Sequence, residues 1–390
     1  MRLLLLAPNE LTRDPRARRA ALAALAAGVD LVGVCGSSPG DEPVPLEGVQ
    51  IVRVPGGRVS AGLRRAGLGG MRQSNPLVRE LRGLYRIGRL AAANLRLTAA
   101  ARRLAPADVV HANDFDTLLA GRLVARRTRA RLVYDAHEIY ADQEPGTPLV
   151  YRALVRLLEG PLARRADAVL TVSEPIAAEL RRTLRLPEEP IVVLSCPPRA
   201  EVEPAPRGDG PLQAIYQGAM GPGRPLEDLL VAAEHAEGIR LTIRVTNADL
   251  EELRRRVVER GLDERVEIAE PVAPDRLVEA LVGFHVGLVI NRPLTRNDEL
   301  VYPNKLFEYL MAGLAVVVSG LPGLAPLVEG ERIGLVYEPS RPEQLGAALT
   351  DLAREPERLG ELRQRARRLA LERFNAEAQR EALAAAWRIK

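Results

Sequence analysis

The segment "PNKLFEYLMAGLAVVVSG", residues 303–320, carries polar side chains that could bind a charged ligand. Asn304 is a good N-cap residue, because its side chain can accept from the free amides of the first helical turn. Lys305 and Glu308 are three positions apart and therefore share one face of that helix. The run Ala315–Ser319 is apolar without alternation, which predicts a strand covered on both faces. Polar residues at a helix start beside a parallel strand are typical of ligand sites in open α/β sheets.

A second candidate is the glycine-rich turn "GAMGPGRP", residues 218–225, which follows an apolar run and precedes an amphipathic segment. The free amides of a helix start and the guanidinium of Arg224 could together bind a diphosphate. However, Gly218 and Gly221 do not have the spacing of the dinucleotide motif G-x-G-x-x-G. Because Gly-Pro turns are also common for structural reasons, both interpretations stay open.

If the two segments meet at one sheet edge, Lys305 and Arg224 could neutralise one diphosphate. Glu308 could then accept hydrogen bonds from both hydroxyls of a ribose. Negative charge builds on a departing diphosphate, and fixed cations with helix amides stabilise that charge without a metal ion. The residues therefore indicate a site for a nucleoside diphosphate whose attached group leaves.

These residues need a framework, and the sequence alternates short apolar runs with amphipathic segments almost throughout. Such alternation predicts parallel sheets built from right-handed crossovers, that is, an α/β fold with two Rossmann-like domains. The expected strands cover residues 2–7, 29–35, 49–54, 107–112, 130–136, 167–173 and 190–196, and then 212–218, 239–246, 265–269, 286–291, 315–319 and 333–337.

Domain boundaries follow from one stretch rich in proline and glycine, "PPRAEVEPAPRGDGP". We expect an N-terminal domain over residues 1–197, a linker over 198–211 and a C-terminal domain over 212–374. Residues 375–390 form a strong helical segment with no strand after it. We expect that helix to pack back on the first domain.

Composition narrows the class of protein. Hydrophobic residues make up 47% of the 390 and charged residues 27%, which is an ordinary globular balance. Only Lys305 and Lys390 are lysines, and the arginines reflect genome composition better than nucleic-acid binding, because aromatic residues are only 3%. Cys35 and Cys196 resemble small buried hydrophobic residues in a reducing compartment. The opening "MRLLLLAPNE" is too short for a signal peptide or membrane span, so we expect a cytoplasmic protein.

Residues 56–106 depart most from the alternating pattern, because a loop rich in Gly and Arg precedes a long helix with arginines on one side. One interpretation is a basic surface near an anionic or membrane-bound substrate. The other, which we favour, is a packed helix whose arginines are solvated.

Several other polar groups allow more than one role. Asp114 and Asp116 form a D-x-D sequence, but they follow a strand and begin a helix, so we favour an N-cap. His111, His137 and Glu138 lack the spacing of a helical H-E-x-x-H metal site.

The start of the first expected helix leaves two interpretations open. Asp14, Arg16 and Arg19 could face a ligand or form an ordinary capped helix start.

The segments "PNKLFEYLMAGLAVVVSGLPGLAPLV" and "GLVYEPSRPEQLGAALTDL" resemble the donor-binding half of family-4 retaining glycosyltransferases of the GT-B architecture. "YDAHEIY" and "DPRARRAALAALAAGVDLV" are similar to one bacterial branch of that family. The resemblance implies two Rossmann-like domains that face each other across a cleft, with the acceptor on the first and the donor on the second. It also implies sugar transfer from a nucleotide-sugar with retention, without a metal or other cofactor.

The resemblance assigns roles to individual residues. Glu308 matches the second glutamate of the family motif E-x7-E, which binds the donor ribose, whereas Leu300 stands in place of the first glutamate and Glu299 is one position out of register. The family's phosphate-binding arginine and lysine fall on Ala219 and Arg224. His137 matches a histidine near the donor sugar, so it is either a catalytic contact or a core histidine.

The sequence therefore predicts a hexosyltransferase-type glycosyltransferase. Its catalytic groups would be His137, Arg224 and Lys305, and Gly218, Gly221, Arg224, Asn304, Lys305 and Glu308 would bind the nucleotide-sugar. The acceptor would be a glycan, a lipid-linked molecule or a small molecule in cell envelope polysaccharide synthesis. We expect no metal, no nucleic acid and a peripheral contact with the inner membrane face. The alternatives are an epimerase-like enzyme and a non-catalytic nucleotide-sugar-binding subunit, and donor base, donor sugar and acceptor stay open.

Overall fold

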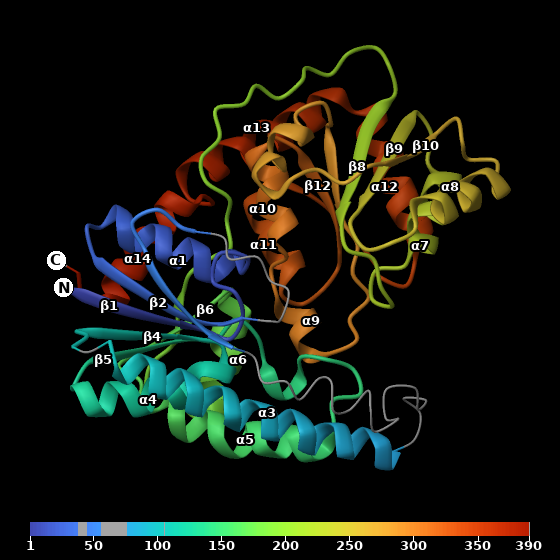
Figure 1. Cartoon of the computed structure of the whole chain (residues 1–390). Coiled ribbons are helices and arrows are strands. Elements are labelled where there is room, and N and C mark those ends of the chain that lie inside the picture. The colour runs from blue at the N-terminus through green and yellow to red at the C-terminus, as the bar shows by residue number, and fades with distance from the viewer. Residues whose placement is uncertain (38–44, 56–75, 105, 390) are drawn as a thin grey trace. The chain divides into compact units, whose positions relative to one another are not determined.

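The computed structural model describes residues 1–37, 45–55, 76–104 and 106–389. The chain divides into two compact units (Figure 1). The first unit comprises Met1–Val193 and Arg380–Lys390, and the second comprises Leu194–Gln379. Each unit contains one parallel sheet with helices packed on it, which confirms the α/β fold class with two Rossmann-like domains.

The first unit contains a seven-stranded sheet with the order β3-β2-β1-β4-β5-β6-β7, and every pairing is parallel. The expected strand over residues 190–196 is shorter in the structure, where Ile191 and Val192 pair with β6 and the Val193 amide makes one further hydrogen bond to Thr171. The strands are β1 (Arg2–Ala7), β2 (Asp30–Ser37), β3 (Gln50–Pro55), β4 (Val109–Asn113), β5 (Arg131–Asp135), β6 (Ala168–Thr171) and β7 (Ile191–Val192).

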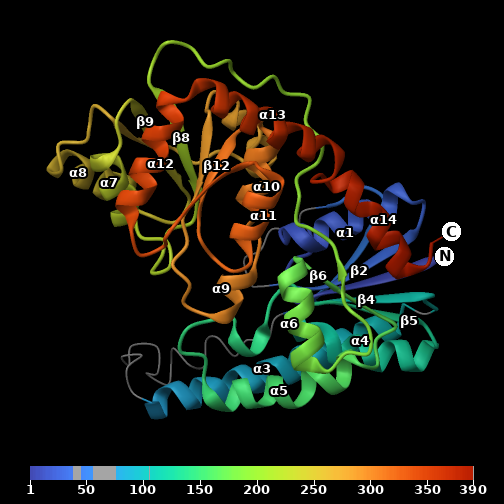
Figure 2. The same ribbon diagram turned by 180° about the vertical axis from the view of Figure 1, so that it is seen from behind.

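Helices cover this first sheet on both faces (Figures 1 and 2). They are α1 (Pro15–Ala26), α3 (Pro76–Arg102), α4 (Phe115–Thr128), the 3₁₀ turn η1 (Tyr140–Asp142), α5 (Leu149–Ala163), α6 (Glu174–Leu184) and α14 (Ala376–Trp387). The last helix returns from the far end of the chain, and its residues Leu383, Ala386 and Trp387 pack in the core between α1 and the sheet. Trp387 is almost fully buried there, which ties the end of the chain to the first unit.

The second unit contains a six-stranded parallel sheet with the order β10-β9-β8-β11-β12-β13. In both sheets the strand order reverses once, between β1 and β4 in the first and between β8 and β11 in the second. Such a reversal separates the helices on the two sides and leaves room for a ligand at the carboxyl edge. The strands are β8 (Leu212–Gly218), β9 (Ile239–Val245), β10 (Val266–Ala269), β11 (Val286–Val289), β12 (Ala315–Ser319) and β13 (Gly334–Tyr337).

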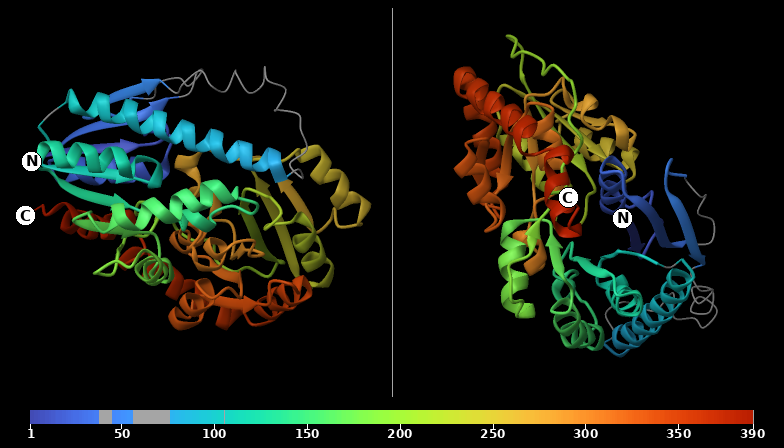
Figure 3. Two further views of the ribbon diagram at one scale, coloured as in Figure 1. Left: turned by 90° about the horizontal axis from the view of Figure 1, so that it is seen from below. Right: turned by 90° about the vertical axis from the view of Figure 1, so that its left-hand side faces the viewer.

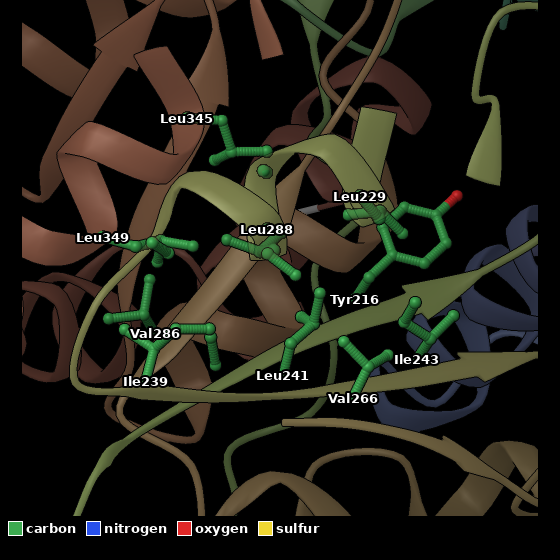
Figure 4. Close-up of a cluster of buried hydrophobic side chains, with 14 of the residues drawn as sticks. Tyr216, Leu229, Ile239, Leu241, Ile243, Val266, Val286, Leu288, Leu345 and Leu349 are labelled. Carbon is green, nitrogen blue, oxygen red and sulfur yellow. The ribbon is translucent and has the colours of Figure 1, made fainter. Parts of the chain in front are cut away.

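The helices of the second unit pack on both faces of this sheet, and Figure 4 shows part of the core beneath them. They are α7 (Leu226–His235), α8 (Leu250–Glu259), η2 (Pro274–Arg276), η3 (Glu279–Leu281), α9 (Arg296–Leu300), α10 (Asn304–Met311), α11 (Leu324–Glu331), α12 (Pro342–Arg354) and α13 (Pro356–Glu372). The core is formed by branched residues of β8, β9 and β11 with leucines of α7 and α12, such as Leu229 and Leu345. The buried, unalternating β12 agrees with the interpretation of its sequence.

Residues 198–211, which the sequence predicts to be a linker, belong to the second unit. Backbone hydrogen bonding explains this: the Ala205 amide donates to the Val282 carbonyl at 2.9 Å, and Arg363 donates to the Ala205 carbonyl at 2.7 Å. In the described part of the chain, no helix combines the length and the hydropathy that crossing a bilayer requires.

Candidate functional site

The carboxyl edge of the second sheet, at the β8/β11 reversal, carries a concentrated group of polar side chains. Gln217 and Gly218 end β8, Asn291 follows β11, and Ser319 ends β12. Helix α10 begins beside these strands, and its first turn brings Lys305 close to Gly218. The two segments that the sequence singled out, 218–225 and 303–320, therefore meet at one edge.

Lys305 has the most unusual environment in this group. Its ammonium nitrogen is buried and lies 4.0 Å from the ring centroid of Tyr216, over the ring face. Among the residues that the structure describes, none is a hydrogen-bond partner for this nitrogen. Burial, together with the like charge of Arg224, lowers the pKa of Lys305 to about 7, although Glu308 opposes the shift. Three hydrogen-bond donors thus remain unused beside the sheet edge.

Gly218 is required by two features of its position. Its φ of +134° lies in a region that residues with a side chain rarely adopt, and a Cβ there would lie 2.9 Å from the Lys305 nitrogen. Gly221 has no such requirement, since a Cβ would meet nothing within 4 Å in the described structure. Of the two glycines proposed from sequence, only Gly218 is therefore fixed by its conformation and by a close contact.

Arg224 sits at the end of a tight turn that precedes α7. The Arg224 amide donates to the Gly221 carbonyl at 2.8 Å, and the turn is tied to the loop after β11 by the Arg292 amide, which donates to the Gly223 carbonyl at 2.7 Å. The guanidinium Nε of Arg224 donates to Asn291 Oδ1 at 3.3 Å, and the side chain is half-buried. Arg224 and Lys305 are close enough for each charge to influence the other.

Glu308 accepts a hydrogen bond from a row of buried polar side chains that the sequence analysis did not predict. Gln217 Nε2 donates to Glu308 Oε2 at 3.3 Å, and Arg244 Nη1 donates to Gln217 Oε1 at 2.8 Å. Arg244, on β9, is only 9% exposed, and its Nε has no hydrogen-bond partner among the described residues. A signal existed in the sequence: "AIYQG" and "LTIRV" each place a long polar residue near the end of a buried strand.

The start of α10 and the helix before it, α9, differ from the sequence-based expectations. Asn304 is not the N-cap: Pro303 occupies that position with extended ψ and Asn304 is the first, exposed helical residue, so its side chain cannot reach back to the amides of the first turn. Leu300 is buried at the end of α9, and the neighbouring Glu299 forms an ion pair with Arg296 on the same helix. Ala219 is exposed and its carbonyl accepts from Tyr216.

In the first unit, His137 lies between two carboxylates. Its Nδ1 is 2.9 Å from Asp114 Oδ1 and its Nε2 is 3.3 Å from Asp135 Oδ2. Burial disfavours the charged ring, but the two aspartates outweigh it and raise the pKa of His137 to about 10. The imidazole is therefore an imidazolium at neutral pH, which can donate hydrogen bonds but cannot act as a general base.

Asp135 is the centre of this second group of charges. Arg16 binds it with both arms of the guanidinium, at 2.8 and 3.0 Å, and His111 Nε2 is 3.5 Å away. Although burial opposes ionisation, Arg16 and the histidines hold the pKa of Asp135 well below its usual range. Trp387 donates to His111 Nδ1 at 2.9 Å, which places the ring proton of a neutral His111 on the side of Asp135.

Asp14 and Asp114 both lie at helix starts in the first unit, but only Asp14 binds the helix amides. Asp14 caps α1 by accepting from the Arg16 and Ala17 amides at 2.9 and 3.0 Å, while the Arg16 side chain is in the buried ion pair described above. Asp114 occupies the N-cap position of α4 without bonding to the helix amides, because its carboxylate binds His137 and Tyr140 instead.

Burial and the like charge of Asp114 raise the pKa of Asp116, although the charges of Arg86 and Arg89 oppose the shift. No group of three or more metal-binding side chains occurs among the described residues. The loop at 56–75 lies outside the described residues.

Comparison with known proteins agrees with this fold. A family model described as "Glycosyl transferase 4-like domain" matches residues 14–197, and one described as "Glycosyl transferase-like" matches residues 224–385. No curated protein matches the sequence.

Solved structures share the architecture over the full chain. HepE from Anabaena, in complex with UDP, has a TM-score of 0.70 at 14% identity and covers 99% of each chain. Sucrose-phosphate synthase from Thermosynechococcus elongatus has a TM-score of 0.72 at 16% identity, over 100% of this chain and 98% of its own. WaaG, a glycosyltransferase involved in lipopolysaccharide biosynthesis, has a TM-score of 0.64 at 13% identity, over 98% of this chain and 99% of its own. With a glycosyltransferase-like domain matched in each half and two Rossmann-like sheets, the chain belongs to the glycosyltransferases of the GT-B architecture.

Proposed function

We propose that the protein transfers a hexose from a nucleoside-diphosphate sugar, with retention and without a metal ion, and that the second unit binds the donor. The observation that carries this proposal is the buried Lys305 ammonium without a hydrogen-bond partner among the described residues. Burying a cation without a partner is costly, so such a group persists where a ligand supplies the opposite charge. A diphosphate at the β8/β11 edge supplies it.

Each group at the edge then has a defined task. Lys305 and Arg224 bind the diphosphate, and Glu308 accepts hydrogen bonds from the ribose hydroxyls. When the bond between the anomeric carbon and the diphosphate oxygen breaks, the electron pair remains on the diphosphate. The two cations stabilise that growing charge, which is the role a metal ion has in other transferases. Because the charge grows during bond breaking, they should favour the transition state over the bound donor.

The hydrogen bonds from Arg244 to Gln217 and from Gln217 to Glu308 keep the ribose-binding carboxylate in one orientation. A glutamate that is already oriented loses less conformational freedom when the donor binds, which improves affinity without a new contact. Gln217 is well suited to this role, since its carbonyl accepts from the arginine while its amide donates to the carboxylate.

The acceptor and the cellular role are proposed from the descriptions of structurally similar proteins. HepE is described in complex with UDP-glucose and with UDP and glucose, and WaaB is described as a lipopolysaccharide outer core galactosyltransferase. We propose a uridine donor and a glycan or lipid-linked acceptor in cell envelope synthesis, on the cytoplasmic side of the membrane. His137 contributes the positive charge of its ring in the first unit and not a base.

The experiment is a binding and turnover series with UDP-, GDP- and ADP-sugars, in buffer containing a chelator. We expect tight binding of one nucleotide and slow hydrolysis of its sugar without an acceptor. Lys305→Met should lower kcat by about a hundredfold, the scale seen when one oxyanion donor is removed. Glu308→Gln should weaken donor binding by roughly 1.5–3 kcal/mol. Arg341→Gln, which follows β13 and breaks only an exposed ion pair with Glu338, is the control.

The outcomes distinguish the alternatives. Binding of a nucleotide-sugar without turnover under any acceptor would indicate a binding subunit, consistent with Leu300 and Ala219 at the motif positions. A changed donor sugar without release would indicate an epimerase-like enzyme. Loss of activity in the chelator would contradict the metal-free scheme, and the anomeric proton of the product, observed by NMR, tests retention.

A further inference from the structure

The first unit exposes an apolar stripe along α3. Leu77, Leu81 and Leu84 are 69%, 44% and 55% exposed, and Leu95 is 69% exposed. Together with the exposed Gly88 and Ala91 they recur in alternating steps of four and three residues, which places them on one face of the helix. In most surface helices the apolar face is the buried one, whereas α3 has an apolar face toward solvent as well.

Helix α5 extends this apolar surface. It packs beside α3 (Figures 1 and 3), and its residues Leu149 and Leu157 are 61% and 69% exposed. Six of the eleven large hydrophobic residues exposed in the described chain lie on these two helices, so they form a patch and are not scattered.

The two helices are held firmly against each other. The Glu80 carboxylate of α3 accepts from the Leu149 and Val150 amides at 3.0 and 2.9 Å, so it caps the start of α5. Gly83 allows close contact, because a Cβ there would lie 2.6 Å from Pro148 Cβ. The patch on α3 and α5 is therefore part of a fixed surface.

The two helices that carry this patch are rich in arginine and poor in acidic residues. Glu80 is the only acidic residue of α3, and it is occupied by the α5 amides, while α5 has Glu159 as its only acid, buried against Tyr134. Three arginines of these helices form ion pairs: Arg79 with Glu80 at 3.4 Å, Arg86 with Glu144 at 3.6 Å and Arg152 with Asp142 at 3.7 Å. The arginines of the two helices are Arg79, Arg82, Arg86, Arg89, Arg96, Arg102, Arg152 and Arg156.

We propose that α3 and α5 form a docking surface for a membrane containing anionic lipids. Leucines enter the boundary between head groups and acyl chains, and arginines contact the phosphates, as in helices that lie in the plane of a bilayer. Three of the arginines, at 82, 89 and 96, recur every seven residues beside the leucine stripe. In a dimer built on the stripe, such rows would meet the like-charged rows of the second copy, which disfavours that partner.

The experiment measures co-sedimentation of the full chain with vesicles. Vesicles of phosphatidylglycerol and phosphatidylcholine in equal parts are compared with pure phosphatidylcholine, at low and high salt. Arg82→Gln with Arg89→Gln should lower binding to the anionic vesicles by about thirtyfold, the effect of two charges near such a surface. Leu81→Gln with Leu84→Gln should lower it by about tenfold or more. Val258→Gln, 61% exposed on α8, and Arg182→Gln, on α6, are matched controls and should change nothing.

Vesicle co-sedimentation is measured without nucleotide, so its result does not depend on the proposed transfer reaction. Binding to anionic vesicles that high salt and either double variant remove supports the proposal. Absence of binding at low salt, or equal loss in the controls, would overturn it. A dimer in sedimentation velocity that requires Leu81 and Leu84, without vesicle binding, would also overturn it and assign the stripe to a second copy.

Discussion

Each unit places a group of charges at the carboxyl edge of its sheet, but the two groups are organised differently. In the first unit, the cations Arg16 and His137 are balanced by two carboxylates, Asp135 and Asp114, at distances of 2.8 to 3.3 Å. In the second unit, Lys305 and Arg224 share a site with one carboxylate, Glu308, and the lysine nitrogen has no hydrogen-bond partner in the described chain.

The difference indicates what each group does. Paired charges hold together elements far apart in sequence, and Arg16 and Asp135 join α1 to β5 across 119 residues. A surplus of cations costs stability in the free protein and is useful only when an anion binds. The direction of the pKa shifts reflects this: the carboxylates raise the pKa of His137, whereas burial and Arg224 lower that of Lys305.

The largest effect should come from breaking the paired group. Arg16→Met leaves Asp135 buried without its bidentate partner, and we expect a loss of about 3 kcal/mol or more from the unfolding free energy of the first unit. Urea unfolding measures it. Arg182→Met, which breaks the exposed pair with Glu179, should cost less than about 1 kcal/mol. Equal losses in the two variants would mean that the Arg16 pair is not structural.

The second effect concerns pH and the histidine of the paired group. Because His137 has a folded pKa of about 10, its ion pairs stabilise the first unit fully below pH 6.5, the unfolded value. That contribution is lost as pH rises toward 10, at up to about 1.4 kcal/mol per pH unit. Urea unfolding at pH 7 and about pH 9 should show the loss. His137→Asn should flatten the profile, and an unchanged slope would contradict the assignment.

The third effect concerns Lys305 in the second unit, whose pKa is shifted in the opposite direction, although the loss again occurs as pH rises. Lys305, with a pKa of about 7 in the free protein, must take up a proton to bind a diphosphate above that pH. Affinity for the nucleoside diphosphate should therefore fall by up to about tenfold per pH unit between pH 7 and 9. Calorimetry in buffers of different ionisation enthalpy measures the affinity and the proton uptake. Lys305→Arg stays charged, so it should show no uptake and should report the titration of the phosphate alone.

The smallest effect should come from breaking the hydrogen bonds that connect Arg244 and Gln217 to Glu308. Arg244→Met removes the donor to Gln217 but keeps much of the apolar stem, so we expect about 1 kcal/mol of lost donor affinity. KM should rise while kcat changes little, because Arg244 acts through Gln217 and does not contact the reacting atoms. A large fall in kcat with unchanged KM would assign a different role. Gln217→Met should reproduce the phenotype, and the double variant should add nothing further.

The sequence by itself determined the sheets and the place of the candidate ligand site. Apolar runs such as Ala315–Ser319 and the helices between them follow from backbone periodicity, which is a local property. A turn after one strand and a helix start after another then had to meet, since carboxyl ends of parallel strands share an edge. Lys305, Arg224 and Glu308 could therefore be predicted as neighbours.

Only the tertiary structure decided which polar groups are paired. His137 lies two residues beyond Asp135 in the chain, but the charge of its ring depends on Asp114 from another strand end as well. Trp387 meets His111 across 276 residues, a contact that no local pattern encodes. The expected cap at Asn304 was wrong because Pro303 takes that position.

Arg244 and Gln217 illustrate the same limit in the second unit. Each is a polar residue in a mostly apolar, buried strand, and the periodicity of the sequence does not predict what it binds. Their hydrogen bonds depend on the register of β8 against β9, where Gln217 faces Arg244 directly. Propensity and periodicity act over one turn or one pleat, whereas the charge state and task of a buried side chain depend on which strands pack beside it.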